Sequence, residues 1–138
     1  MSELYNQSLN EFIEKAAYNS PTPGGGNVSA VIATLAASMV SMVANLTIGK
    51  KGYEEVQDKA KKAADDLKNI IEDLKTLTEK DMAVFSKFME ALRMPKDTDE
   101  QKAKRTEAMQ QAAKTATEVP MEICRKCLEI LKISVPIA

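Results

Sequence analysis

The sequence has 138 residues, 44% of them hydrophobic, and a net charge of −1, which is typical of a single folded domain spanning residues 1–138. Its 19 basic residues are interleaved with 20 acidic ones and only 4% of residues are aromatic, which excludes the surfaces that bind nucleic acids. The sequence contains no histidine, so Ser-His and Cys-His nucleophiles are excluded and the commonest metal ligand is missing. No basic segment followed by an apolar run begins the chain. We therefore expect a cytoplasmic protein without a metal.

A first helix is predicted near the N-terminus. Ser8 and Glu11 have the spacing of a capping box, and the helix is expected to end near Tyr18. Its apolar face would contain Phe12, Ile13, Ala16 and Ala17.

A loop rich in proline and glycine follows at residues 19–27. Pro21 and Pro23 favour an extended backbone, and the glycines at 24–26 allow conformations that other residues avoid. Gly26 or Asn27 can then cap the next helix, whose free amides would attract an anion or a carbonyl oxygen. The alternative is a tight turn that lets two helices pack closely.

Residues 28–48 carry no charge and are rich in Ala, Ser, Thr, Val and Met, which predicts a helix buried at the centre of a helical protein. Its length would also allow a transmembrane span. Asn45, the repeated Ser and Thr residues and the lack of a flanking aromatic belt argue against a membrane. The helix is expected to end at Gly49, with Lys50 and Lys51 as favourable charges at its C-terminal end.

Residues 53–93 contain no Gly or Pro and predict one long helix. A heptad seam that packs against another helix is formed by Val56, Ala60, Ala63, Leu67, Ile70, Leu74 and Leu77. The same register places Asp81 on the seam, where an apolar residue is expected. Burial would raise the pKa of this carboxyl group, as general acid–base catalysis near neutral pH requires. The alternatives are a register slip that exposes Asp81 and a structural salt bridge to a lysine.

The remainder of the chain is also predicted to be helical. Pro95 ends the long helix, and Thr98 with Gln101 forms a second capping box. Residues 103–117 form a helix, and Pro120 starts or kinks a further segment at 119–133. The buried side of this segment would contain Ile123, Cys127, Ile130 and Leu131.

Cys124 and Cys127 form a Cys-x-x-Cys pair, which raises the possibility of a metal or redox site. A closed zinc site needs four ligands, and the sequence has no other Cys and no His. We therefore expect both to be small core residues.

Five segments in this order resemble the family of formiminotetrahydrofolate cyclodeaminases and methenyltetrahydrofolate cyclohydrolases. They are Pro-Thr-Pro-Gly-Gly-Gly-Asn-Val-Ser-Ala at 21–30, Met-Val-Ala-Asn-Leu-Thr-Ile-Gly-Lys at 42–50, Asp-Met-Ala-Val-Phe at 81–85, Met-Pro-Lys at 94–96 and Glu-Val-Pro at 118–120. The resemblance implies an all-helical, dimeric protein that handles a one-carbon unit on tetrahydrofolate without a metal or other cofactor. Family members continue past residue 138, so this domain is expected to lack the family's C-terminal helix.

The resemblance implies conversion of 5-formiminotetrahydrofolate to 5,10-methenyltetrahydrofolate and ammonia. The alternatives are methenyltetrahydrofolate cyclohydrolase activity and a helical oligomerisation module without enzymatic activity. For the enzyme we infer Asp81 as the catalytic proton-transfer group. The candidate substrate-binding residues are Pro23, Gly24, Gly25, Gly26, Asn27, Asn45, Lys50 and Lys51. The two lysines would receive the folate carboxylates, or else they are ordinary helix-end charges.

Overall fold

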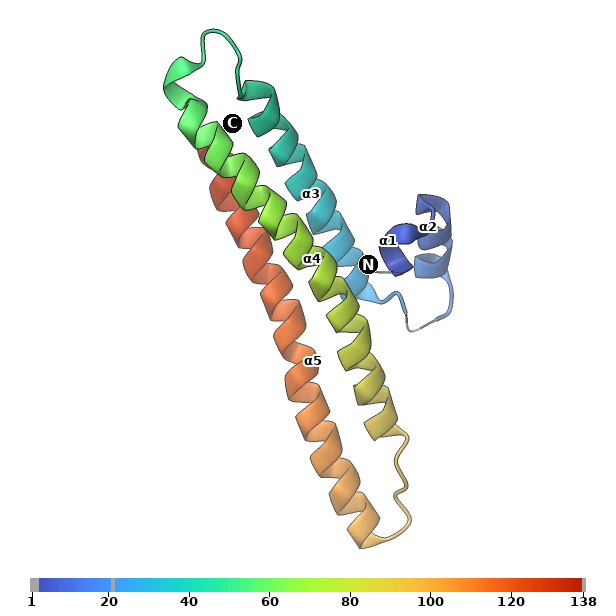
Figure 1. Cartoon of the computed structure of the whole chain (residues 1–138). Helices are drawn as coiled ribbons and strands as arrows, with labels where there is room; N and C mark the ends of the chain where they lie inside the picture. Colours follow the sequence, from blue (N-terminus) through green and yellow to red (C-terminus); the bar gives the residue numbers. More distant parts are fainter. Residues whose placement is uncertain (1–2, 21, 138) are drawn as a thin grey trace.

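The computed structural model describes residues 3–20 and 22–137, and these residues form helices and no strand (Figure 1). Two short helices at the N-terminus precede three long ones. The helices are α1 (Glu3–Asn6), α2 (Leu9–Ala17), α3 (Gly25–Thr47), α4 (Gln57–Leu92) and α5 (Asp99–Ser134), with 3-10 turns at Glu54–Val56 and Val135–Ile137. The predicted all-α class is confirmed.

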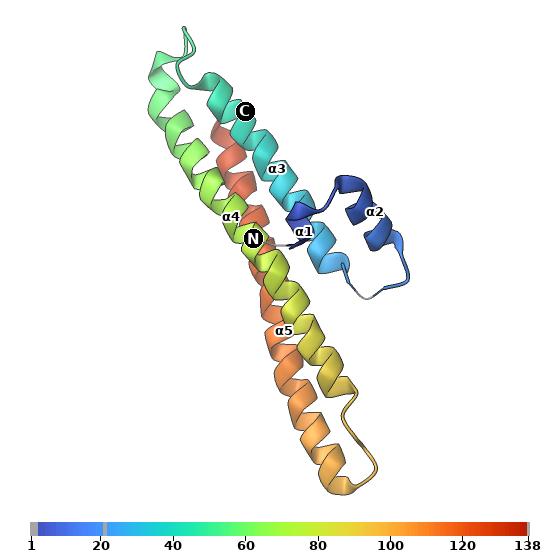
Figure 2. The same cartoon turned by 45° about the vertical axis from the view of Figure 1, so that its right-hand side comes forward.

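The three long helices form an elongated antiparallel bundle in which α4 contacts both α3 and α5 (Figures 1 and 2). The helix α3 runs beside only the first part of α4, and beyond it α4 and α5 continue as a pair. The short helices α1 and α2 lie beside the N-terminal end of α3. The start of α3 therefore lies midway along α4, where the three-helix part gives way to the two-helix part.

The core follows the predicted seam. The residues of α4 at seam positions that are buried are Ala60, Ala63, Leu67, Ile70, Leu74 and Leu77, and the register continues through Val84 and Ala91. From α5, Val119, Ile123 and Ile130 pack into the same core. Apolar side chains at alternating steps of three and four lie on one face of a helix, so the seam holds α4 against its neighbours.

Three local predictions were wrong. Pro120 does not start a new helix, because α5 continues through it and core residues of α5 on both sides of the proline hold the helix against α4; a kink there stays a prediction. Leu131 is 62% exposed and not part of the core. On α2 the capping box of Ser8 is present, but Phe12 is buried while Ile13 is exposed, so the predicted apolar face is only partly covered.

The helix α3 is buried along one face only. Its alanines at 30, 33, 37 and 44 face α4 and α5, whereas Ile32, Leu35 and Met39 are each more than half exposed. By length and composition alone α3 could cross a membrane, and 39% of its most apolar window is buried in the bundle. That this helix has no membrane partner stays a prediction.

The buried amide of Asn27 fixes the start of α3 against α4. The helix begins at Gly25 with Gly24 as N-cap, three residues earlier than predicted. Asn27 is 1% exposed; its Oδ1 accepts a hydrogen bond from the Gly24 amide at 2.9 Å, and its Nδ2 donates one to the Thr78 carbonyl at 3.0 Å. The Thr78 hydroxyl lies 3.1 Å from the hydroxyl of Tyr5, which extends the network to α1.

Replacing Asn27 with Ala should destabilise the protein. The change leaves the Thr78 carbonyl and the Gly24 amide without their partner, and we expect a loss of about 2–4 kcal/mol in the free energy of unfolding. Urea denaturation at one fixed protein concentration measures it. The matched control is Asn45→Ala on the exposed part of α3, which should change stability by less than about 0.5 kcal/mol. Equal losses for the two variants would contradict the bridging role.

Candidate functional site

Asp81 lies on α4 just beyond the level at which α3 begins. It follows the buried Thr78 by one helical turn and occupies the seam position predicted for it. Its side chain is half-buried, and this burial raises the pKa of its carboxyl group above the ordinary Asp value. Among the described residues no cation or hydrogen-bond donor reaches the carboxylate. The structure therefore excludes the salt bridge that the sequence left open.

The Asp81 carboxyl group packs directly against Gly26. A Cβ atom at position 26 would lie 2.5 Å from Oδ2 and 2.9 Å from Cγ of Asp81, so any side chain there would displace the carboxylate. By contrast, a Cβ atom at Gly25 would meet nothing within 4 Å. Glycine at position 26 thus allows the carboxyl group to take this position, and the structure brings this end of the glycine loop together with Asp81 within one chain.

The first turn of α3 offers unpaired amides beside this carboxyl group. The first three amides of a helix have no intrahelical acceptor, and the bond from Val28 to the Gly24 carbonyl is the first to close. Because Gly24 has no side chain, it cannot accept a bond from these amides, as Ser or Asp would at the N-cap. The amides of Gly25 and Gly26 and the helix dipole therefore remain available to an oxygen or an anion.

Two predicted binding residues are committed to the fold instead. Both hydrogen-bonding ends of the Asn27 amide have partners inside the protein, so this side chain positions the helix start and is not free to hold a ligand. Pro23 is buried, so its ring is likewise not exposed to a ligand. Sequence reasoning assigned both residues to the substrate because it placed the helix start after them.

Three further predicted residues lie at the other end of α3. Gly26 and Thr47 are about 31 Å apart at 1.5 Å per helical residue, and Lys50 and Lys51 follow Thr47. Asn45 is exposed near that end, with its Nδ2 3.3 Å from the Ser41 hydroxyl. Within one chain, the structure does not bring Asn45, Lys50 or Lys51 to Asp81. That these three residues bind the substrate stays a prediction.

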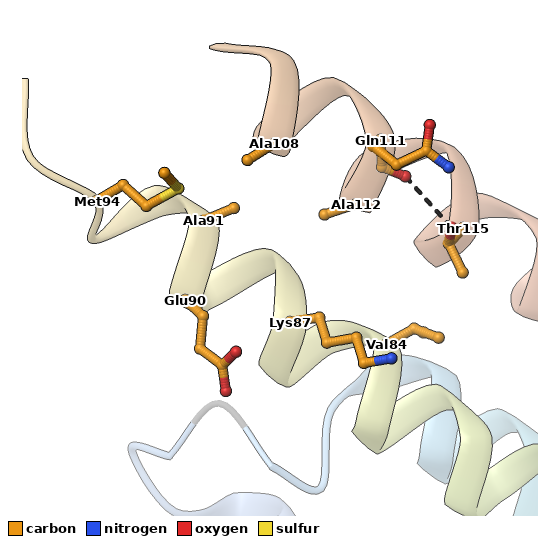
Figure 3. A pocket seen from close by; sticks show the side chains of 9 residues that line it. All are labelled: Val84, Lys87, Glu90, Ala91, Met94, Ala108, Gln111, Ala112 and Thr115. Carbon is orange, nitrogen blue, oxygen red and sulfur yellow. Dashed lines mark hydrogen bonds between the residues drawn. The ribbon is translucent and has the colours of Figure 1, made fainter. Parts of the chain in front are cut away.

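A groove between α4 and α5 was missed by the sequence analysis. It has a volume of about 470 Å³ and begins at Val84, one turn beyond Asp81. Figure 3 shows Ala91 on α4 facing Ala108 and Ala112 on α5 across the gap. The available signal was the pair Ala108 and Ala112, four residues apart on α5, because small side chains leave space where larger ones would fill it. Asp81 itself does not line the groove, which extends from Val84 towards the ends of α4 and α5 that meet at the loop after Leu92.

The cysteines do not form a site in this structure. Both thiols are free; Cys124 is exposed, which corrects the prediction of a core residue, and Cys127 is partly buried against the core. Burial raises the pKa of the Cys127 thiol, which makes it less reactive. No group of three or more His, Cys, Asp or Glu among the described residues is arranged to hold a metal ion. That the protein acts without a metal stays a prediction.

Similarity to known proteins covers nearly all of the chain. The chain is 40% identical over 129 residues to methenyltetrahydrofolate cyclohydrolase of Methylorubrum extorquens, a match that covers 94% of this chain and 62% of that protein. It is 34% identical over 123 residues to formimidoyltransferase-cyclodeaminase of Gallus gallus, covering 89% of this chain and 23% of that protein. The chain thus spans less than two thirds of the length of either relative.

A solved structure has the same fold. Formiminotetrahydrofolate cyclodeaminase from Thermotoga maritima superimposes with a TM-score of 0.74 at 27% identity, covering 98% of this chain and 74% of that one. The profile of the formiminotransferase-cyclodeaminase family matches residues 8–138. The chain therefore belongs to the formiminotransferase-cyclodeaminase family.

Proposed function

We propose that this protein is a folate one-carbon enzyme that converts 5-formiminotetrahydrofolate to 5,10-methenyltetrahydrofolate and ammonia. The observation that carries the proposal is the half-buried, unpaired Asp81 carboxyl group packed against Gly26 at the start of α3. An oligomerisation module has no need to place a carboxyl group with a raised pKa beside free helix amides. The structural neighbour from Thermotoga maritima bears the name of this activity.

Asp81 is assigned the proton transfer of the reaction. The N10 amine attacks the formimino carbon on N5, a C–N bond forms, and the bond to the departing nitrogen breaks. The formimino group reacts in its protonated, amidinium form. The Asp81 carboxylate accepts the proton released from N10 and delivers it to the departing nitrogen, which leaves as neutral ammonia while the positive charge stays on the methenyl bridge. The amides of Gly25 and Gly26 bind polar atoms of the pterin or the charge that develops during the reaction. Holding the two reacting nitrogens at attack distance supplies much of the rate enhancement.

A second candidate is methenyltetrahydrofolate cyclohydrolase, favoured by the 40% identity to the Methylorubrum extorquens protein of that name. In this reaction water adds to the methenyl carbon and the ring opens to 10-formyltetrahydrofolate. Asp81 would accept a proton from the water and return it to N5 as the ring opens, and the second proton of the water is released to solvent as the formyl C=O bond forms. The groove that begins one turn beyond Asp81 would receive part of the substrate in both reactions.

The enzyme is proposed to act without a cofactor, in the cytoplasm and as a homodimer. The chemistry of both reactions balances without a metal or other cofactor, since only protons move between Asp81 and the substrate. We assign the protein to the cytoplasm, as expected from its sequence. We also assign it to a homodimer, because the exposed apolar face of α3 needs a covering surface. On this basis α3 is a helix of a soluble bundle.

A spectrophotometric assay of the purified chain tests the function. With 5-formiminotetrahydrofolate the cyclodeaminase creates the methenyl chromophore, and with 5,10-methenyltetrahydrofolate the cyclohydrolase removes it. Gain of the chromophore together with release of ammonia is the expected result, and loss of the chromophore favours the second candidate. If neither folate is turned over or bound, the protein is an oligomerisation module and the proposal is wrong.

Removing the acid–base group should abolish most turnover. We expect Asp81→Asn to lower kcat by about 10²–10⁴-fold, which is the usual contribution of general acid–base catalysis. The control is Asp65→Asn, which removes an exposed carboxylate from the same helix and should leave kcat unchanged. Full activity of Asp81→Asn would contradict the catalytic assignment, even if folate binding persisted.

Asp81 should also affect how stability depends on pH. Because burial raises its native pKa, its contribution to stability is fully present below the ordinary Asp value of about 3.9 and is lost as the pH rises through the native pKa. Asp81→Asn is therefore expected to be more stable than the wild type at pH 7, and this difference should vanish as the pH falls towards about 3. Urea denaturation at several pH values measures the difference. A pH-independent difference would refute the raised pKa.

The contact between Gly26 and Asp81 can be tested by adding a single methyl group. Gly26→Ala forces the carboxyl group to move away from the start of α3, and we expect kcat/KM to fall by at least about tenfold. Gly25→Ala is the control for stability, since its methyl group meets open space and should change the free energy of unfolding by no more than about 1 kcal/mol. Unchanged kinetics in Gly26→Ala would show that the position of the carboxyl group does not matter.

A further inference from the structure

Beyond the start of α3, one face of the α4–α5 pair has no third helix over it. In both views α3 begins midway along α4, and only α4 and α5 continue past that level (Figures 1 and 2). Residues 18 apart on a helix project from the same side, because about 18 residues complete five turns. The side of α4 that faces the core beside α3 is therefore repeated beyond it: the core residues Leu67, Ile70 and Leu74 have their counterparts in Phe85, Phe88 and Leu92.

The helix α5 continues its core-facing side in the same way. Arg105 precedes the core residue Ile123 by 18 residues, and Met109 precedes Cys127, which packs against the core, by the same number. We call the uncovered surface of the two helices the open face, and its residues are Asp81, Phe85, Phe88 and Leu92 on α4 with Arg105 and Met109 on α5. All of them are half-buried except Leu92, which is 39% exposed.

The open face has one charged group at each end and apolar side chains between them. Asp81 lies at the end next to the start of α3, and Arg105 lies at the far end, beside Leu92. The side chains between these two charges are aromatic or aliphatic. This pattern fits an elongated ligand that has an N–H group at one end, an aromatic middle and an anion at the other end.

The guanidinium group of Arg105 is held in place without being neutralised. Its Nε and Nη2 donate hydrogen bonds to the Leu92 carbonyl at 3.2 and 3.1 Å. A guanidinium has about five N–H donors, so most of them are not used in this contact. In the described part of the chain, no carboxylate forms an ion pair with Arg105. A positioned guanidinium with unused donors is suited to bind a carboxylate through two parallel hydrogen bonds.

We propose that Arg105 binds the glutamate carboxylate of the folate substrate and that the open face holds the benzoyl ring between Asp81 and Arg105. The inference rests on the proposed function, and it names the residue that selects folates with a glutamate tail. Arg105 takes the role that the sequence had suggested for Lys50 and Lys51. Those lysines lie at the opposite end of α3 from Gly26, whereas Arg105 lies on the surface that begins at Asp81.

The length of the substrate fits the separation of the two charged groups. Leu92 follows Asp81 by eleven residues, or about 16 Å along α4. By ordinary bond lengths, an extended benzoylglutamate spans about 11–13 Å from N10 to its two carboxylates. Hydrogen bonds of about 3 Å to Asp81 at one end and to Arg105 at the other bring the total to about 17–19 Å. The remaining difference of about 2 Å is within the reach of the Asp81 and Arg105 side chains.

Substrates with and without the glutamate test the assignment. Each folate is compared with its pteroate counterpart, which has the same reacting atoms and benzoyl ring but no glutamate. We expect the wild type to prefer the folate in kcat/KM by at least about tenfold, and Arg105→Ala to remove this preference by acting on the folate alone. The kcat with the folate should stay near the wild-type value, because Arg105 is far from the reacting atoms. Arg105→Lys keeps the charge without the planar fork, so it should keep part of the preference.

Two control variants separate binding of the carboxylate from other effects. Arg93→Ala removes an exposed guanidinium at a similar distance along α4 from Asp81 and should keep the preference. Phe85→Ala removes a contact with the shared benzoyl ring, so folate and pteroate should lose kcat/KM alike. If Arg105→Ala lowers kcat/KM equally for both substrates, Arg105 only supports the end of α4 and the proposal is wrong. An equal loss of preference in Arg93→Ala would also overturn it, because it would show a long-range attraction instead of a contact.

Binding of a folate that does not react separates this inference from the proposed function. 5-Formyltetrahydrofolate, which has no departing nitrogen, and its pteroate counterpart can be titrated calorimetrically. Arg105→Ala should weaken binding of the folate by at least about tenfold and leave binding of the pteroate unchanged. If this result is found although the wild type turns over neither substrate, the proposed reaction fails and the assignment of Arg105 holds. If the wild type binds folate and pteroate equally, or binds neither, the assignment of Arg105 is wrong.

Discussion

The structure depends on the hydrogen bonds made by one buried side chain. The amide of Asn27 joins the Gly24 amide to the Thr78 carbonyl, and so it fixes the level at which α3 begins alongside α4. Asp81 follows Thr78 by one turn, and its carboxyl group therefore comes to rest against Gly26. A shift of α3 along α4 by one turn, about 5.4 Å, would separate the carboxyl group from the free amides. The contact between Asp81 and Gly26 thus rests on the hydrogen bonds of Asn27, whose own side chain is buried.

The sequence was sufficient to predict the features that follow from periodicity. The heptad seam of α4 identified Asp81 as a carboxylate in an apolar position, and both capping boxes were found at Ser8 and Thr98. The start of α3 could not be placed correctly. Glycine is a poor helix former, so Gly25 and Gly26 were expected in the loop, whereas the buried bonds of Asn27 hold them in the helix.

Other features depend on tertiary contacts that no local pattern encodes. Pro120 is tolerated inside α5 because the core contacts on both sides of it outweigh the loss of one hydrogen bond. Small residues on every face of α3 were interpreted as complete burial, yet the bundle of a single chain covers only one face. The small residues of α3 show how closely another helix can approach, but not which helix packs against each face. For this reason the sequence suggested that Lys50 and Asp81 belong to one site, but it did not reveal that they lie at opposite ends of α3.

The raised pKa of Asp81 and the free amides at Gly26 have the same physical origin. Both arise because α3 begins with glycines at the middle of the bundle, where α4 continues without a third helix to cover it. The carboxyl group loses part of its hydration to α3, and the absence of an N-cap side chain leaves the amides unpaired. A Ser or Asp at position 24 would give a more stable helix start, but it would occupy the amides that a ligand needs. Glycine there gives up some stability for binding capacity, as is common at functional sites.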